Sequence, residues 1–196
     1  MITLESIAVV VTLLAVYLTT RQVIWCWPLG MISVSLYAVV FYQSKLYADM
    51  GLQAIYFVLA GYGWWAWRRG GGNHETLRVS WASRNARMVL VTIGAVAGIV
   101  LGQTLHVLTD ASLPFMDSTL TAYSIVAQWM QTRKVLEAWL VWLAVDVFYV
   151  GMFLYKGLYL TAGLYAVFLY LAVLGFVEWR RSMVRDVAQP CEEPTR

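Results

Sequence analysis

The sequence predicts an all-α integral membrane protein with seven transmembrane helices. Composition is the first indication, because 61% of the residues are hydrophobic and only 13% are charged, whereas a soluble domain is about half apolar and a quarter charged. The second is a series of seven long apolar runs, and the third is a one-sided distribution of Lys and Arg between them. A soluble helical bundle with a rich core would not need apolar runs of membrane length.

Each apolar run approaches the roughly 20 residues that an α-helix needs to cross the hydrocarbon core. In chain order the runs are 4–20, 26–43, 48–67, 88–107, 116–131, 135–155 and 157–178. The first and fifth runs are short for a membrane span. A polar linker, residues 70–87, separates the third run from the fourth, and a polar tail, residues 182–196, follows the seventh.

The basic residues orient the chain in the membrane. Of the 14 Lys and Arg residues, all except Lys45 and Lys156 lie on one side of the predicted membrane. The positive-inside rule assigns that side to the cytoplasm, which predicts a periplasmic N-terminus and a cytoplasmic C-terminus. Glu5 stands where a cleavable signal peptide would be basic, so the first run is kept as a span. The net charge of +3 then needs no nucleic-acid partner.

Residues that build metal sites and active sites are sparse. The two cysteines, Cys26 and Cys191, and the two histidines, His74 and His106, lie far apart, which argues against a disulfide framework or a zinc site. No nucleophile–base pair stands out, and the glycines at 70–72 follow a predicted helix as a hinge, not as a phosphate-binding loop. We therefore expect no cofactor and no enzymatic activity.

The chain contains an internal repeat. Residues 4–69 align without gaps on residues 116–181 at a constant offset of 112, with 19 identities in 66 positions. Membrane composition shared by the two segments does not explain these identities, because tryptophans, tyrosines, glycines and arginines match at one constant offset. The matches include Trp27 with Trp139, Tyr37 with Tyr149, Gly63 with Gly175, and Trp67-Arg68-Arg69 with Trp179-Arg180-Arg181.

This repeat predicts a 3+1+3 arrangement, in which two three-helix bundles (4–69 and 116–181) are joined by a linking helix (88–107). Because each bundle has an odd number of spans and one helix lies between them, both copies have the same orientation, which makes the repeat parallel. Parallel repeats are typical of carriers whose substrate site lies near the midplane between the bundles. We therefore expect a small carrier.

Polar and aromatic residues on shared helix faces are the candidates for lining the path. In the sixth span the spacing i, i+3, i+7, i+10 places Trp139, Trp142, Asp146 and Tyr149 on one face. The other candidates are Tyr37 of the second span, Gln53 and Tyr56 of the third, Ser124 and Gln128 of the fifth, and Tyr165 of the seventh.

Structural roles are the alternative for most of these residues. Tryptophan and tyrosine near the ends of spans commonly form an interfacial belt. A stripe of Ser, Thr and Gln, like that of the fifth span, can join helices by hydrogen bonds. Asp49 and Asp117 lie near span ends, where water can solvate their carboxylates.

Asp146 differs because it lies in the middle of the run WLVWLAVDVFYVG, residues 139–151. No Lys, Arg or His falls within the core of a predicted span, apart from His106 near an outer end. Asp146 is then protonated, hydrogen-bonded, or the counter-ion of a visiting solute. Aromatic rings beside a carboxylate suit a flat organic cation through stacking and cation–π attraction, although a proton relay would produce the same pattern.

Several motifs resemble those of the PnuC family of vitamin transporters. They are IWCWPLG (24–30), KLYADMGLQ (45–53), YGWWAW (62–67), the run from TRKVLEAW to Asp146 (132–146), and KGLYLTAGLY (156–165). The resemblance covers roughly residues 5–181. It implies a fold related to the SWEET sugar carriers, a homotrimer, and facilitated diffusion across the bacterial inner membrane, with the vitamin trapped by phosphorylation in the cytoplasm.

Common members of this family carry nicotinamide riboside for NAD biosynthesis, and its pyridinium is a flat cation that suits Asp146. Thiamine, which a branch of the family carries, has a thiazolium that suits Asp146 as well and remains the alternative. Riboflavin, the substrate of another branch, is neutral and ranks third. We expect Gln53 and Gln128 to hydrogen-bond the ribose or pyrimidine of the vitamin.

Overall fold

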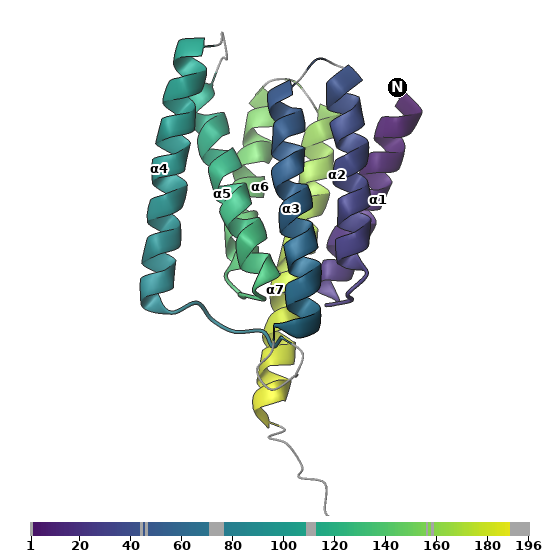
Figure 1. Cartoon of the computed structure of the whole chain (residues 1–196), viewed down its shortest axis with the longest axis vertical. Helices are drawn as coiled ribbons and strands as arrows, with labels where there is room; N and C mark the ends of the chain where they lie inside the picture. Colours follow the sequence, from purple (N-terminus) through teal and green to yellow (C-terminus); the bar gives the residue numbers. More distant parts are fainter. Residues whose placement is uncertain are drawn as a thin grey trace, which may run out of the picture.

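The computed structural model describes residues 2–43, 45, 47–70, 77–108, 113–155, 157 and 159–188. Over these residues the chain forms helices that run alternately down and up (Figure 1). They are α1 (Ile2–Thr20), α2 (Cys26–Gln43), α3 (Tyr47–Arg69), α4 (Arg84–Leu108), α5 (Pro114–Thr132), α6 (Ala138–Tyr155) and α7 (Tyr159–Ala188). The all-α fold and the seven predicted helices are confirmed.

The helices differ in how apolar they are. α2, α4, α6 and the Tyr159–Arg185 part of α7 are long and apolar enough to cross a bilayer, and Leu4–Thr20 of α1 is a shorter apolar helix. α3 and α5 carry more polar residues within the bundle, among them Gln53 in α3 and Gln128 in α5. In both helices, polar residues that could line a path lower the hydropathy.

Helix boundaries differ from the apolar runs at their polar ends. α6 begins three residues later than its run, because the residues before it form a turn in which Lys134 has a φ of 50°. α4 begins at Arg84, inside the predicted linker, and α7 continues to Ala188, inside the predicted tail. Hydropathy marks only the part of a helix that is apolar, whereas backbone hydrogen bonds carry the helix further into water.

Four tryptophans form a core near the starts of α2 and α6 and towards the ends of α3 and α7. We call Trp27, Trp67, Trp139 and Trp179 the tryptophan cluster; each is at most 4% exposed. Trp27 and Trp67 meet edge to face at a centroid distance of 5.2 Å, and Trp139 and Trp179 do so at 5.3 Å. Trp67 and Trp179 join the two pairs at 5.8 Å. Edge-to-face contact suits the quadrupoles of the rings, so this cluster holds α2, α3, α6 and α7 together.

Two glycines provide the space for these rings. A Cβ atom on Gly63 would lie 2.4 Å from the Trp27 ring, and one on Gly175 would lie 2.5 Å from the Trp139 ring. Only glycine allows the ring to pack directly on the helix backbone at these positions. The sequence matches both glycines and both tryptophans at the offset of 112.

Residues 112 positions apart also make equivalent hydrogen bonds and equivalent turns. The Trp67 indole N–H donates to the Gln131 carbonyl at 3.1 Å, and the equivalent Trp179 N–H donates to the equivalent Thr19 carbonyl at 3.0 Å. The backbone adopts positive φ at residues 112 apart: at Gln22 and Lys134, and again at Lys45 and Gly157. Residues at this offset therefore have matching environments.

α4 lies at the edge of the bundle and packs mainly against α5 (Figure 1). Gly94, Gly98 and Gly102 are buried on the side of α4 that faces α5. A Cβ atom on Gly98 would lie 3.0 Å from the backbone of Thr119, so the two helices approach closely. Small residues four apart are a common basis of helix association in membranes. The spacing of these glycines in the sequence is a signal for this helix contact.

The described part of the linker is docked on the bundle. Residues 77–83, which we call the strap, pair with the turn before α6 through an isolated parallel bridge between Ser80 and Val135. The Ser80 N–H donates to the Lys134 carbonyl at 3.1 Å, and the Leu136 N–H donates to the Ser80 carbonyl at 3.0 Å. The linker was predicted as a polar cytoplasmic segment with a glycine hinge at residues 70–72. Residues 71–76 lie outside the described residues, and the strap has a defined position on the bundle.

Burial and charge also hold the strap. Val79 is 6% exposed and packs with the tryptophan cluster, as does the partly buried Leu77. The backbone N–H of Ala82 lies 3.1–3.2 Å from both carboxylate oxygens of Glu137. Arg87 in the first turn of α4 pairs with the same carboxylate at 3.8 Å. The strap thus packs against the tryptophan cluster and is tied to the turn before α6.

Candidate functional site

Asp146 lies on α6 and is 4% exposed, so the structure buries the carboxylate that the sequence singled out. Within the described part of the chain, no side chain or backbone group gives this carboxylate a hydrogen bond or an ion pair. A buried carboxylate without a partner is strongly disfavoured. Asp146 is therefore a candidate to contact a solute.

An aromatic cluster lies beside Asp146, across α6 and α7. Tyr149 lies one turn after Asp146 on the same face of α6, and its ring meets that of Tyr165 at a centroid distance of 4.8 Å. Phe153 contacts Tyr165 at 5.1 Å, and Phe168 contacts it edge to face at 5.7 Å. Tyr165 is thus at the centre of a group of rings that borders the carboxylate.

Tyr37 on α2 has the environment of its repeat equivalent, Tyr149. It stacks on Phe41 at 5.9 Å, and Tyr149 stacks on Phe153 at 5.8 Å. Tyr37 also lies within electrostatic range of Tyr165. The structure therefore brings this residue of α2 near the aromatic cluster of α6 and α7.

Tyr56 and Ser124 join α3 to α5. Ser124 is 4% exposed and donates to the Thr121 carbonyl at 2.8 Å, so the Tyr56 hydroxyl donates to the Ser124 oxygen. Tyr56 is also close enough to Tyr149 and Tyr165 to interact electrostatically. Ser124 thus acts as the interhelical contact that was the alternative for the polar stripe, and Tyr56 reaches the aromatic cluster.

Trp142 and Trp139 occupy different parts of the α6 face. Trp142 is partly buried and donates from its indole N–H to the Gln131 side-chain oxygen at 3.2 Å. Trp139 is 1% exposed and belongs to the tryptophan cluster, where the described residues leave its N–H without a partner. The face from Trp139 to Tyr149 is about 15 Å long, so its lower end meets the core while its upper end meets the aromatic cluster.

Gln53 on α3 and Gln128 on α5 are half-buried. Neither amide has a hydrogen bond to another described residue, so both could bind the polar atoms of a solute. Gln131, which the sequence analysis missed, is 7% exposed and links Trp142 to the tryptophan cluster through its two oxygens. Its position one helical turn after Gln128 could have indicated it.

Metal ligands are not assembled in the described ranges, where no group of three His, Cys, Asp or Glu side chains could hold an ion. Cys26 is buried and is a free thiol. His74 and Cys191 lie outside the described residues. The chemistry of the site is therefore that of a buried carboxylate, aromatic rings and amides.

A bundle of apolar helices that encloses such a site defines a small multi-pass membrane transporter. Residues 2–181 match the family described as nicotinamide mononucleotide transporter, and the chain belongs to this family. This confirms the resemblance of the sequence motifs to those of the PnuC family.

Similar proteins are named as transporters, but their substrates differ. The chain is 28% identical to the nicotinamide riboside transporter PnuC of Escherichia coli K12, covering 91% of this chain and 85% of that protein. It is also 28% identical to the riboflavin/roseoflavin transporter RibM of Streptomyces davaonensis, over 93% of this chain and 86% of that protein. These relatives are transporters, so the expectation that the chain is not an enzyme is confirmed.

The fold itself has a solved counterpart. A crystal structure of the vitamin B3 transporter PnuC matches with a TM-score of 0.72 at 28% identity, covering 93% of this chain and 82% of that one. The all-α membrane fold predicted from the apolar runs is therefore confirmed.

Proposed function

We propose that the protein carries nicotinamide riboside across the bacterial inner membrane. The observation that carries this proposal is Asp146, which is 4% exposed, has no partner among the described residues and borders an aromatic cluster. A site of this kind favours a solute that brings its own positive charge and a flat ring. The pyridinium of nicotinamide riboside has both properties.

Each part of the vitamin has candidate contacts. Asp146 offsets the charge of the ring, and Tyr149 and Tyr165 offer aromatic faces beside it. Gln53 and Gln128 have amides available for the ribose hydroxyls. Trp142 and Tyr37 border this region, whereas Trp139 acts through packing.

Thiamine is the alternative substrate, because its thiazolium is also a flat cation. Riboflavin is a third candidate, because RibM is 28% identical to this chain, as is the E. coli nicotinamide riboside transporter. Sequence identity therefore does not separate nicotinamide riboside from riboflavin. Charge favours nicotinamide riboside, because riboflavin is neutral and would leave Asp146 uncompensated.

We further propose that transport is facilitated diffusion, with the vitamin trapped by cytoplasmic phosphorylation to supply NAD biosynthesis. A coupled proton relay would require a second charged group close to Asp146, and the described residues provide none. In proteoliposomes, flux should follow the solute gradient and be unaffected by an uncoupler. Accumulation of unmodified vitamin that the uncoupler abolishes would show proton coupling instead.

The proposed architecture is a parallel repeat of residues 4–69 and 116–181, with α4 as the linking helix and a homotrimer as the assembly. The matching environments of residues 112 apart support the repeat. Gln22 and Lys134, which are equivalent to each other, also meet directly, with the lysine Nζ donating to the glutamine Oε1 at 3.0 Å. Such a contact between equivalent residues is expected beside a twofold axis.

A binding titration with three vitamins tests the substrate. Purified protein is titrated with nicotinamide riboside, thiamine and riboflavin, and the ten tryptophans report binding by fluorescence. The tightest binding is expected for nicotinamide riboside, and neutral nicotinamide is the control for the charge. Saturable riboflavin binding together with no response to either cation would overturn the proposal.

A further inference from the structure

Over the described residues, the helices other than α4 form a closed ring. α1, α2, α3, α5, α6 and α7 each pack on the next helix in that order, and α7 packs on α1, whereas α4 lies outside and packs on α5. The turn between α1 and α2 and the turn between α5 and α6 lie at the same end of this ring (Figure 1). Three helices separate these two turns in either direction round the ring, so the turns lie opposite each other.

The two opposite turns meet. The Lys134 Nζ donates to the Gln22 Oε1 at 3.0 Å, and Lys134 is only 8% exposed. Its ammonium also lies 4.6 Å from the centroid of the Trp67 ring, which favours a cation. The Gln22 Nε2 donates in turn to the Ser182 oxygen on α7 at 2.7 Å. Because Gln22 and Lys134 come from opposite sides of the ring, their contact occupies the centre of the ring at this level.

This contact lies between the candidate site and one end of the bundle. Asp146 lies about 12 Å along α6 from Ala138, its first residue, and Lys134 belongs to the turn before α6. Basic residues near the ends of α3 and α7 assign this end to the cytoplasm. A solute that moves from Asp146 along the centre of the ring towards this end has to pass between Gln22 and Lys134.

Other polar contacts at this end join helices that are neighbours in the ring. Arg21 after α1 pairs with Glu178 of α7 at 3.8 Å, and Arg181 shares that carboxylate at 3.6 Å. Arg133 after α5 donates to the Tyr62 hydroxyl of α3 at 2.7 Å. These contacts hold α1 to α7 and α3 to α5. They close the seams of the ring, whereas the contact between Gln22 and Lys134 spans its centre.

We propose that Gln22 and Lys134 form the barrier between the candidate site and the cytoplasmic end, and that their contact separates each time a solute leaves towards that end. A hydrogen bond to a charged group stabilises the closed arrangement appreciably and is still reversible. Movement of one repeat against the other around a fixed site is a common mode of transport, and it would part the two turns. The barrier rests on the proposed transport function but not on the identity of the vitamin.

Cys26 is a native reporter of opening at this level. Its thiol is 3% exposed and packs with the tryptophan cluster, so we expect it to react with N-ethylmaleimide only when this end opens. The labelling rate is measured on the full-length protein in detergent, with Cys191→Ser to remove the other thiol. Lys134→Met and Gln22→Leu each remove the hydrogen bond and should label about 10- to 100-fold faster. Gln22→Glu turns the contact into an ion pair and should label more slowly than the wild type.

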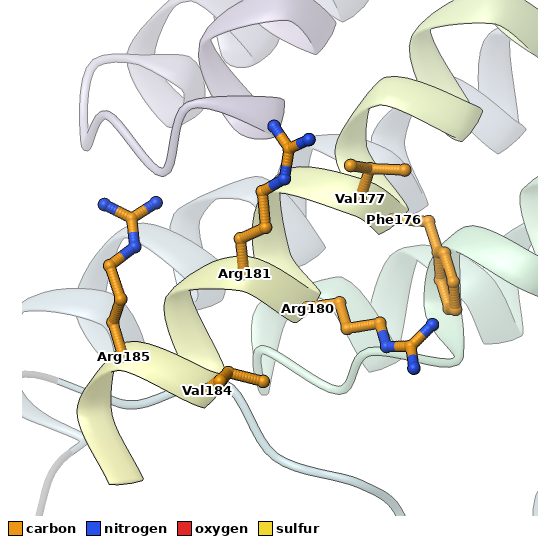
Figure 2. A pocket seen from close by; sticks show the side chains of 6 residues that line it. All are labelled: Phe176, Val177, Arg180, Arg181, Val184 and Arg185. Atoms are coloured by element: carbon orange, nitrogen blue, oxygen red, sulfur yellow. The ribbon is translucent and has the colours of Figure 1, made fainter. Parts of the chain in front are cut away.

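Arg180→Gln is the matched control. It removes one positive charge at the same end, but its side chain is exposed, and Figure 2 shows it extending to the other side of α7 from Arg181. Its labelling rate should equal that of the wild type. Unchanged rates in Lys134→Met and Gln22→Leu, or an equal acceleration in Arg180→Gln, would overturn the barrier. Should Lys134→Met fail to fold, Gln22→Leu and Gln22→Glu still decide, because they must shift the rate in opposite directions.

Flux through proteoliposomes separates this inference from the proposed function. Gln22→Glu should lower the maximal flux of nicotinamide riboside and leave its binding affinity unchanged, because the barrier lies outside the candidate site. Wild-type protein that carries no vitamin would overturn the transport function, and the labelling rates would still decide whether Gln22 and Lys134 hold this end closed. Wild-type flux together with unshifted labelling would overturn the barrier alone.

Discussion

At the scale of single residues, two tryptophan rings each pack directly on a glycine of a neighbouring helix. Gly63 and Gly175 have no side chain, and the rings of Trp27 and Trp139 occupy the space that a methyl group would need. These rings are among the most buried side chains of the bundle, and the other two tryptophans hold them in edge-to-face contact. Little freedom remains for them to move.

Gly175→Ala should therefore destabilise the protein. Its Cβ would lie 2.5 Å from the Trp139 ring, and overpacking of this kind costs about 1–3 kcal/mol. Gly163→Ala is the matched control on the same helix, because nothing lies within 4 Å of its Cβ. Thermal unfolding in detergent should show a lower midpoint for Gly175→Ala alone. Equal midpoints for the two variants would contradict the packing described here.

At the scale of elements, the strap shows what a sequence pattern does not reveal. It belongs to the polar linker predicted from the sequence, yet Val79 is buried against the tryptophan cluster and the Ala82 N–H donates to Glu137. These contacts depend on a turn more than 50 residues further along the chain. Local composition carries no information about such a partner, which explains why the strap was missed.

Glu137→Ala should loosen the strap. The substitution removes the acceptor of the Ala82 N–H and the ion-pair partner of Arg87. Hydrogen bonds to charged groups contribute about 1.5–3 kcal/mol, so amide exchange at Ser80 and Ala82 should become about 10- to 100-fold faster. Glu178→Ala, which breaks ion pairs on α7 instead, should leave exchange in the strap unchanged. Unaltered exchange in Glu137→Ala would show that apolar burial alone holds the strap.

The candidate site was predictable only in part for a related reason. Hydrophobic run length located every helix, and helical spacing placed Asp146 and Tyr149 on one face of α6. The same spacing also included Trp139, which belongs to the core. Periodicity identifies a face but not which neighbouring helix covers each part of it. Hydrogen-bond partners such as Gln131 and Trp142 require the packed structure.

At the scale of the whole molecule, charge should set the orientation. Basic residues lie near the ends of α3 and α7 and in the first turn of α4, whereas Lys45 precedes α3 at the opposite end. The positive-inside rule then predicts that the chain ends in the cytoplasm. A reporter active only in the periplasm, fused after residue 196, should be silent. The same reporter fused before Glu5 behind an export signal is the positive control, and activity of the C-terminal fusion would reverse the orientation.

The central claim is that Asp146 offsets the positive charge of the solute. Asp146→Asn keeps the shape of the side chain and removes its charge, so the folded variant should bind nicotinamide riboside about 10- to 100-fold more weakly. The uncharged dihydro form of the same nucleoside should bind the wild type and the variant equally. The decisive measurement is the fluorescence titration of both proteins with both ligands: a loss confined to the cation supports the account, and unchanged affinity for the cation in the folded variant would contradict it.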